Sequence, residues 1–285
     1  MAELIIVLGP TAVGKTDYSI GLALEYGSPV ISCDSRQIYR EMKIGTAPPS
    51  PEQLARVKHY FIGTRSVCDP PYTAGRYELD ALELVENLFK DHGTLVMAGG
   101  SGLYIDAFCN GLDAFPEVDP SVRASLMDRL EKEGLESLRF ELRKLDPETF
   151  GSIDTANRQR VVRALEVCIG TGRPFSSFKT ASAAERPFTI RKIGLNRERQ
   201  DLYSRIDRRV DLMMEEGLEE EARSLLPLRD LPALNTVGYR EMFGYFDGKY
   251  PLEEAVRLIK RNTRHYAKKQ LTYWGRDESI EWKNL

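Results

Sequence analysis

Residues 9–16, GPTAVGKT, combine the residue types that hold a chain of phosphates. Gly9 and Gly14 allow backbone conformations closed to other residues, so backbone N–H groups can turn inward around an anion. Lys15 adds a full positive charge, and the Thr16 hydroxyl is placed to ligate a magnesium ion. An apolar run, LIIVL, precedes the motif and a helix-like stretch follows it. The pattern predicts a phosphate-binding loop between a strand and a helix N-terminus, without indicating which molecule carries the phosphates.

A candidate acid follows the next apolar stretch, VISC, at residues 30–33. Kinases and ATPases with such a loop usually carry an acid after an apolar strand, where it helps to hold magnesium. The later stretch at 94–104 ends instead in a Gly-Gly-Ser-Gly run, whereas Asp34 follows the earlier one. In parallel sheets, strand-end loops form the ligand crevice. We expect Asp34 to accept a proton there; the alternative is that Asp34 and Ser35 only cap the next helix.

Composition excludes several classes of protein. The chain has 285 residues, of which 42% are hydrophobic and 29% are charged, as in globular proteins. No apolar run approaches the ~18 residues of a membrane span, and the opening segment MAELIIVLG is typical of a buried strand rather than a signal peptide. The four cysteines are scattered and the three histidines form no cluster, which argues against a disulfide framework or a structural zinc site. We therefore expect a cytoplasmic protein with reduced thiols.

The net charge of −3 argues against a uniformly basic surface, but the charges are unevenly distributed. Residues 257–276, RLIKRNTRHYAKKQLTYWGR, hold seven Lys or Arg and no acid. Such local asymmetry favours a phosphate-binding face that the net charge conceals. Because Lys260, Arg264 and Lys268 recur at i, i+4 spacing, a helix would carry them as one stripe.

Short apolar segments alternate with helical patterns over the first 110 residues. The expected strands are residues 4–8, 29–33, 59–62 and 94–98. A helical period is clear between them, for example in residues 74–91. This alternation predicts a mainly parallel sheet flanked by helices on both faces.

The pattern changes after Gly111. Periodicity is helical from 119 to about 178, which indicates a small helical insertion. Residues 187–196 return to a strand pattern and are expected to rejoin the sheet, and helices then fill most of 197–273. The predicted fold class is therefore α/β with an inserted all-helical subdomain.

Several stretches together resemble the tRNA dimethylallyltransferase (isopentenyl-tRNA transferase) family. The resemblance covers nearly the whole chain, and several motifs in order are far more specific than any one of them. The motifs are GPTAVGKT, DSRQIY at 34–39, KIGTAPP at 43–49, GGSGLY at 99–104, RQRVVRALE at 158–166, RIDRRVDLMMEEGL at 205–218, VGYRE at 237–241 and KKQLTYW at 268–274. The zinc finger of eukaryotic members has no Cys/His counterpart, so the resemblance is to the bacterial type.

The resemblance implies a P-loop NTPase-like α/β core, residues 1–111 and 187–285, and a helical insertion, 112–186, that contacts tRNA. It also implies the reaction. A dimethylallyl group passes from dimethylallyl diphosphate to the exocyclic N6 amine of adenosine 37, next to the anticodon of tRNA, and diphosphate departs. The loop at 9–16 would thus hold a leaving group rather than ATP, with magnesium aimed where negative charge develops.

The same resemblance implies the residues of the reaction centre. Asp34 would act as general base, and Arg209 would grip the diphosphate in the transition state. Lys15 and Thr16 would also be catalytic, with Thr16 as magnesium ligand. Ser101 stands where the family commonly has threonine and keeps the hydroxyl. The implied diphosphate-binding residues are Gly9, Pro10, Thr11, Ala12, Val13, Gly14, Lys15, Thr16 and Ser101.

The implied partner is the anticodon stem-loop of tRNA, with the target base flipped out and read in a channel. Two departures concern tRNA contacts: HYFIGT lacks the family's frequent His-His-Leu, and APP replaces the usual Ala-Lys-Pro, which removes a basic residue at position 48. The implied tRNA contacts are Asp34, Ser35, Arg36, Gln37, Ser101, Arg123, Gln159, Arg160, Arg163, Gly238, Tyr239, Arg240, Lys268, Lys269, Gln270 and Trp274.

Three other functions fit parts of the pattern. One is an adenylate isopentenyltransferase, with the same chemistry on a free nucleotide. Another is a small-molecule or nucleoside kinase with ATP in the loop, and a third is an NTP-switched binding module. The helical insertion and the basic stretch favour tRNA, since a free nucleotide needs neither. We expect a monomer that engages no membrane and needs no protein partner.

Overall fold

The computed structural model describes residues 2–113, 115–179 and 184–285. The chain forms two compact units. Unit 1 comprises Met1–Gly111 and Glu185–Leu285, and unit 2 comprises Leu112–Ala184. The range that the sequence suggests for the insertion, 112–186, includes residues 114 and 180–183, which lie outside the described residues.

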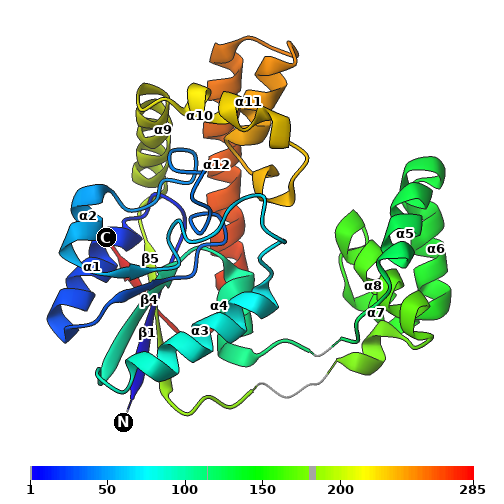
Figure 1. Cartoon of the computed structure of the whole chain (residues 1–285), viewed down its shortest axis with the longest axis horizontal. Coiled ribbons are helices and arrows are strands. Elements are labelled where there is room, and N and C mark those ends of the chain that lie inside the picture. The colour runs from blue at the N-terminus through cyan, green and yellow to red at the C-terminus, as the bar shows by residue number, and fades with distance from the viewer. Residues whose placement is uncertain (1, 114, 180–183) are drawn as a thin grey trace. The chain divides into compact units, whose positions relative to one another are not determined.

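Unit 1 is built on a six-stranded sheet in the order β3-β2-β4-β1-β5-β6 (Figure 1). All neighbouring strands run parallel, as the sequence predicted. At the carboxyl edge Leu8 of β1 pairs with Gly99 of β4, so the loops that follow these two strands leave side by side. The strands are β1 (Glu3–Leu8), β2 (Val30–Ser32), β3 (His59–Tyr60), β4 (Thr94–Gly99), β5 (Thr189–Asn196) and β6 (Ile280–Asn284).

Helices cover both faces of the sheet. Alternate residues of β1 enter two different hydrophobic clusters: Leu4 and Ile6 join one, and Ile5 and Val7 join the other. A strand buried on both faces reads as a continuous apolar run, as LIIVL does. The helices of unit 1 are α1 (Lys15–Tyr26), α2 (Pro51–Arg56), α3 (Ala74–Leu88), α4 (Gly102–Asn110), α9 (Arg199–Glu215), α10 (Leu218–Ser224), α11 (Tyr239–Phe246) and α12 (Leu252–Trp274), with two short 3-10 turns at Leu226–Leu228 and Pro232–Leu234.

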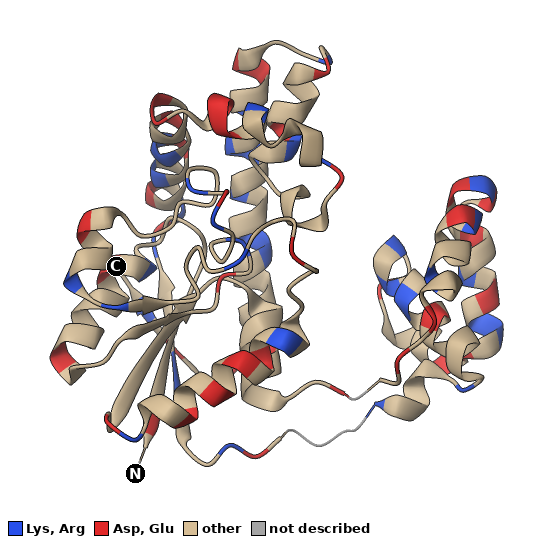
Figure 2. Cartoon of the chain, in the orientation of Figure 1, with Lys and Arg blue, Asp and Glu red and all other residues tan. Residues whose placement is uncertain are grey.

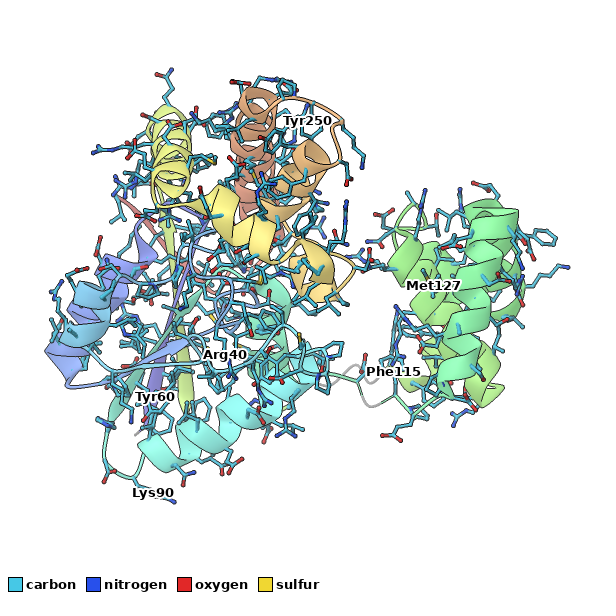
Figure 3. All side chains as sticks on the ribbon, turned by 45° about the horizontal axis from the view of Figure 1, so that its top comes forward. Arg40, Tyr60, Lys90, Phe115, Met127 and Tyr250 are labelled. Atoms are coloured by element: carbon cyan, nitrogen blue, oxygen red, sulfur yellow. The ribbon has the colours of Figure 1, made fainter. Side chains whose placement is uncertain are left out.

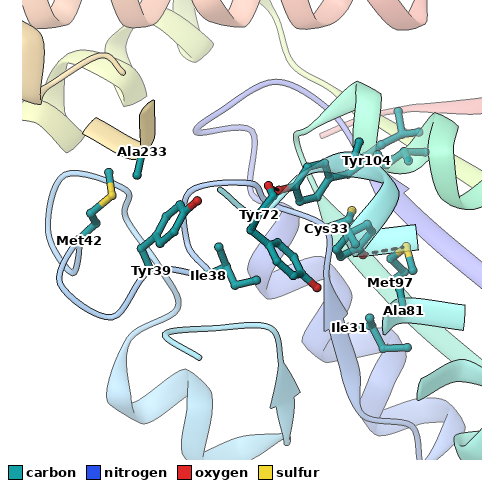
Figure 4. Packing of buried hydrophobic residues seen from close by; sticks show 14 of the residues in the cluster. Ile31, Cys33, Ile38, Tyr39, Met42, Tyr72, Ala81, Met97, Tyr104 and Ala233 are labelled. Carbon is teal, nitrogen blue, oxygen red and sulfur yellow. Dashed lines mark hydrogen bonds between the residues drawn. The ribbon is translucent and has the colours of Figure 1, made fainter. Parts of the chain in front are cut away.

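The larger cluster lies directly behind the end of β2 (Figure 4). Tyr77 is buried there, stacks on Tyr104 with ring centroids 4.5 Å apart, and donates its hydroxyl to Ser32 O at 3.1 Å. Ile38 and Tyr39 from the loop after β2 pack into the same cluster. The segment around Asp34 is therefore anchored on both sides by buried groups.

Strand β6 was not predicted from the sequence. It pairs in parallel with β5 at the edge of the sheet, from Ile280 opposite Lys192 to Asn284 opposite Asn196. Only Ile280 is buried, and the rest of the strand is exposed. Backbone pairing rather than an apolar pattern holds it in place, so periodicity gives no signal for it.

Unit 2 is all helical, as its sequence pattern predicted. Its core combines Leu126, Leu138, Leu142 and neighbouring side chains of α8. Asp119 caps the first helix by accepting from Ser121 N, with Pro at the first helical position. The elements are α5 (Pro120–Glu133), α6 (Leu135–Leu145), α7 (Pro147–Ser152), α8 (Arg158–Thr171) and a 3-10 turn at Phe175–Phe178. Within the described parts of both units, no helix is long and apolar enough to cross a membrane.

Candidate active site

The phosphate loop (residues 9–16) connects β1 to α1. Gly9, Ala12 and Gly14 have φ angles of 149°, 65° and 108°. Positive φ at several positions of a short loop lets backbone N–H groups turn toward one point and form an anion-binding concavity. Helix α1 begins at Lys15, so the unpaired N–H groups of its first turn face the same side. The predicted phosphate-binding geometry is present.

Lys15 lies beneath this loop. Its Nζ donates to Gly9 O and Pro10 O, each at 2.9 Å. Burial lowers the pKa of Lys15 to about 8, against an opposing effect of Asp34 and with a further lowering effect of Arg209. A buried ammonium next to another cation favours an incoming anion.

Gln270 of α12 ties the loop to the end of β4. Its Oε1 accepts from Thr11 N at 2.9 Å, and its Nε2 donates to Gly100 O at 2.8 Å. A Cβ at Gly100 would lie 2.5 Å from Gln270 Nε2, so this approach requires glycine. Gln270 is 6% exposed. Since both ends of its amide are bonded inside the protein, its visible role is to hold the loop, and the tRNA contact implied for it finds no support here.

Asp34, in the segment that follows β2, lines the same cavity as Lys15. Its Oδ1 accepts from Arg36 N at 2.8 Å and from Gln37 N at 3.2 Å. Asp34 therefore caps the segment that follows it, but this segment is a turn and not the helix that the alternative expected. Its other oxygen, Oδ2, accepts no hydrogen bond within the described residues, which leaves one carboxylate oxygen for a proton.

The turn after Asp34 is held by polar contacts from several segments. Ser101 Oγ accepts from Ser35 N at 2.9 Å and donates to Ser35 Oγ at 3.0 Å. Gln37 Nε2 donates to Ala47 O at 2.9 Å, and Arg36 Nη1 donates to Pro232 O at 3.3 Å. The structure thus gives Ser101 a place beside Ser35, while its implied contact with the diphosphate stays a prediction.

Arg209 reaches the phosphate loop from α9. Its Nη1 lies 3.4 Å from Thr11 Oγ1. Burial, followed by the nearby charge of Arg205, lowers its pKa. No carboxylate forms an ion pair with Arg209 in the described parts of the chain. An arginine in this position has donors available for an anion.

Two cavities meet at Arg209. The first, about 210 Å³, contains the phosphate loop with Thr16, Asp34 and Gln270 in its lining. The second, about 770 Å³, has a mainly apolar lining. The residues that line both include Gln37, Ala47, Pro48, Pro49, Gln53, Ile62 and Arg209. The apolar members of the larger cavity include Met42, Ile44, Pro51, Leu54, Leu212 and Met213. A small polar cavity and a larger, mainly apolar cavity therefore adjoin each other and share part of their lining.

The basic stretch on α12 is only partly a free surface (Figure 2). Lys260 pairs with Asp211 at 2.5 Å and Arg264 with Asp207 at 2.5 Å, so these two residues bind α9. The helix that would carry Lys260, Arg264 and Lys268 as one stripe is present, but two of these three cations are paired with acids. Lys268 and its neighbour Lys269 are exposed and have no acid partner in the described chain.

Other residues of the implied tRNA surface differ in their accessibility. Tyr239 is fully buried and donates to Glu221 at 2.7 Å, and Trp274 is 3% exposed. These two side chains belong to the core, which does not match a contact with a macromolecule. Gly238 is also buried, whereas the Arg240 side chain is 52% exposed.

In unit 2 the implied tRNA residues gather on α8 and α5. Gln159 and Arg160 are exposed in the first turn of α8, whose N-cap is Asn157. Arg123 and Arg163 both pair with Glu166, at 2.9 and 3.3 Å. The carboxylate is nearly buried and the two guanidinium groups remain about half exposed, so the pairing orients them without hiding them.

Two residues that contact the loop were not identified from the sequence. Arg197 Nε donates to Val13 O and Arg205 Nε donates to Ala12 O, each at 2.9 Å. Arg205 precedes Arg209 by one helical turn, and that spacing was an available signal. Arg197 lies between β5 and α9, and no local pattern indicates its role.

The fold and the site define a P-loop α/β protein: the phosphate loop follows the first strand of an all-parallel sheet, and four basic side chains, those of Lys15, Arg197, Arg205 and Arg209, form hydrogen bonds to it. The sequence model of the family described as IPP transferase matches residues 37–277. The chain belongs to this family.

Individual relatives agree with this assignment. The chain is 55% identical to tRNA dimethylallyltransferase 2 of Porphyromonas gingivalis, over 98% of this chain and 93% of the relative. The full-length tRNA isopentenylpyrophosphate transferase of Bacillus halodurans superposes with a TM-score of 0.73 at 36% identity, covering 100% of this chain and 90% of that one. A eukaryotic dimethylallyltransferase acting on tRNA shares the fold, with a TM-score of 0.81 at 23% identity, over 100% of this chain and 74% of that one.

Proposed function

We propose that this protein transfers the dimethylallyl group of dimethylallyl diphosphate to N6 of adenosine 37 in tRNA and releases diphosphate. Its membership of the IPP transferase family supports the reaction. The observation that carries the proposal is that the polar cavity of about 210 Å³ at the phosphate loop adjoins the mainly apolar cavity of about 770 Å³, with Arg209 in the lining of both. A prenyl diphosphate has both a polyanionic and a hydrocarbon end, and so suits both cavities.

The proposed reaction forms one bond and breaks one. The N6 amine attacks the allylic carbon, the carbon–oxygen bond breaks, and the diphosphate leaves with the electron pair. Loop N–H groups, Lys15 and Arg209 stabilise the negative charge that grows on the leaving group. Asp34, with Oδ2 available, takes the proton that the attacking amine loses. Because an aromatic amine is a weak nucleophile, positioning supplies much of the rate enhancement.

The oxygen donors at the phosphate loop suit a magnesium ion. Mg²⁺ prefers oxygen ligands and commonly retains water and substrate phosphate oxygens rather than a cage of protein ligands. Thr16 lines the anion site on the first turn of α1, and within the described residues no cluster of three His, Cys, Asp or Glu stands ready for a metal. The Thr16 hydroxyl would hold the ion, which would neutralise charge on the diphosphate.

The proposed acceptor is the anticodon stem-loop of tRNA. The exposed cations Arg160 and Arg163 of unit 2 and Lys268 and Lys269 of unit 1 suit its phosphates. Since tRNA is the acceptor, the proposed enzyme works in the cytoplasm. One chain supplies every residue of the proposed reaction centre, from Gly9 to Gln270, so the proposed enzyme acts as a monomer.

The binding of dimethylallyl diphosphate is expected to weaken as pH rises above about 8, because the pKa of free Lys15 is about 8. A bound anion raises that pKa, so binding above pH 8 must take up a proton, and the dissociation constant should rise about tenfold per pH unit. Titration calorimetry from pH 7 to pH 9.5 measures this. Lys15→Arg stays charged over this range and should give a flat profile; a slope equal to that of the wild type would contradict the assignment to Lys15.

Alanine at both Lys268 and Lys269 is expected to weaken tRNA binding and reduce its salt dependence. Each lost phosphate contact should flatten the slope of log K against log salt by about 0.7–0.9. Affinity for dimethylallyl diphosphate should be unchanged. Filter binding across a salt series gives both quantities for tRNA.

Two controls accompany this pair. Lys90→Ala removes an exposed lysine just beyond α3, where its side chain extends into solvent (Figure 3). Lys260→Ala removes a cation that pairs with Asp211. Both should keep the wild-type salt slope, and an unchanged slope in the Lys268 and Lys269 variant would exclude this face as a tRNA contact.

The proposed function is tested by incubating the protein with labelled dimethylallyl diphosphate, magnesium and unmodified tRNA, then digesting the tRNA. We expect a prenylated adenosine, and none from tRNA with guanosine at position 37. Parallel reactions contain AMP in place of tRNA, or ATP in place of the prenyl donor. Transfer to AMP alone would support the free-nucleotide alternative, and ATP turnover without prenyl transfer would support a kinase.

A further inference from the structure

The outer side of the phosphate loop is held by hydrogen bonds at several carbonyl groups. Lys15 Nζ donates to Gly9 O and Pro10 O, and Val13 N also donates to Pro10 O at 3.4 Å. Arg205 donates to Ala12 O and Arg197 donates to Val13 O. Carbonyl groups fixed on the outside of a loop leave the N–H groups of that loop on the inside, where the anion binds.

Ala12 is the strained residue of this loop. Its φ of 65° is left-handed, a region that a residue with a Cβ enters only at a cost in free energy. The residue is buried, at 4% exposed, and Val13 beside it is fully buried. Such a conformation persists when the surroundings determine it. The hydrogen bond from Arg205 to Ala12 O is the side-chain contact that the structure gives to this peptide unit.

Arg205 is well placed to impose this conformation. It lies one helical turn before Arg209 on α9, and α9 is packed on the sheet through Leu202 and Ile206. The carbonyl that it binds therefore has a fixed position relative to β1. Arg197, whose side chain is 21% exposed, is itself oriented by an ion pair with Asp201 at 3.0 Å and holds the adjacent carbonyl.

We propose that Arg205 is a positioning residue for the transfer reaction: its hydrogen bond to Ala12 O holds the left-handed backbone that directs the loop N–H groups at the diphosphate. This rests on the proposed function, since it concerns the same diphosphate. The competing explanation is that Arg205 acts only through its charge, because it also lines the anion cavity. The two explanations predict different effects of glycine at position 12 on the affinity for pyrophosphate.

The experiment is a double-mutant cycle on pyrophosphate affinity, measured by calorimetry at pH 7. Arg205→Met keeps the length of the side chain but removes the donor, and its affinity is expected to fall about tenfold. Glycine adopts the left-handed region without the Cβ penalty. Ala12→Gly should therefore be more favourable, by about fivefold, in the Arg205→Met protein than in the wild type, well beyond the ~2-fold scatter of independent sites.

An equal effect of Ala12→Gly in both backgrounds would overturn the proposal, because lost charge is not restored by glycine. Arg205→Lys supplies a second test, since it keeps the charge and loses the Nε donor. We expect it to resemble Arg205→Met, and wild-type affinity in this variant would also overturn the positioning role. Arg208→Met is the matched control, an exposed arginine on α9 without a hydrogen bond to described residues; it should bind as the wild type does.

The outcome is separable from that of the proposed function. Pyrophosphate binding needs neither tRNA nor turnover, so coupling between positions 12 and 205 can be found in a protein that transfers no prenyl group. Thermal unfolding of each variant identifies any loss of folding. In the transfer assay, we expect Arg205→Met to raise the KM for dimethylallyl diphosphate and to lower kcat, because the same N–H groups serve ground state and transition state.

Discussion

Replacing Asp34 by asparagine is expected to lower the turnover number about 10²–10⁴-fold, the usual contribution of a positioned general base. Asparagine keeps an oxygen where Asp34 Oδ1 accepts from Arg36 N and Gln37 N, so the turn after β2 is preserved. The change removes the carboxylate charge that takes the proton from adenine N6. Single-turnover transfer from labelled dimethylallyl diphosphate to tRNA measures the loss.

Alanine at the same position separates capping from catalysis. Asp34→Ala loses both the base and the acceptor of two backbone N–H groups, so its thermal midpoint should fall as well. At pH 7 the Asp34→Asn variant should bind pyrophosphate at least as tightly as the wild type, since a negative charge has left a cavity that contains Lys15 and Arg209. Wild-type turnover of the asparagine variant at saturating substrates would show that Asp34 is not the base.

Asp34 could be found from the sequence because the relevant rule is topological. In a parallel sheet the carboxyl ends of the strands share one edge, so residues that follow β1, β2 and β4 meet even when they are distant in the chain. The apolar runs that predicted these strands thus also predicted that Asp34 and the phosphate loop would share a cavity. The general-base role depends on chemistry that geometry alone does not test.

The conformation of the phosphate loop was predictable only in part. The glycines at positions 9 and 14 indicated positive φ angles. Ala12 gave no such indication, because alanine normally avoids the left-handed region of backbone conformation. Its conformation depends on Arg205, which is 193 positions away along the chain. Gln270, which is 259 positions from Thr11, is a similar case. Contacts of this range arise from tertiary packing; the one-turn spacing of Arg205 and Arg209 could indicate that both side chains face the same way, but not which backbone group Arg205 binds.

For the basic stretch on α12, the sequence suggested more cations available for binding than the folded protein leaves. Within that helix the i, i+4 spacing of cations looked like a free stripe, but Asp207 and Asp211 on α9 recur at the same spacing and neutralise Lys260 and Arg264. The pairing becomes visible only when the two helices are known to be neighbours. Charge density along one helix is therefore a weaker guide to a binding surface than charge left unpaired after folding.

Arg209 stays without an acid partner among the described residues after folding. Replacing it by alanine is expected to lower kcat about 10²–10³-fold, which is the usual effect of losing one hydrogen-bond donor to a developing anion. The fork of the guanidinium group suits the oxygens of a diphosphate, so Arg209→Lys should recover only part of the loss. The KM for dimethylallyl diphosphate should change less than kcat, because the charge on the leaving group grows toward the transition state. Steady-state kinetics with saturating tRNA separates the two constants.

The stability of the same variant gives an independent test of why Arg209 is there. Burial and the charge of Arg205 both disfavour the charged form of the Arg209 guanidinium group. Arg209 has no carboxylate partner among the described residues, so it contributes no salt bridge to the fold. Removing it should leave the thermal midpoint unchanged or raise it, while activity collapses. A clear fall in the midpoint would mean that Arg209 serves the fold through Thr11, and that its effect on turnover follows from a displaced loop. Neighbouring cations that repel each other lower the stability of the fold, and an anion bound between them removes that cost.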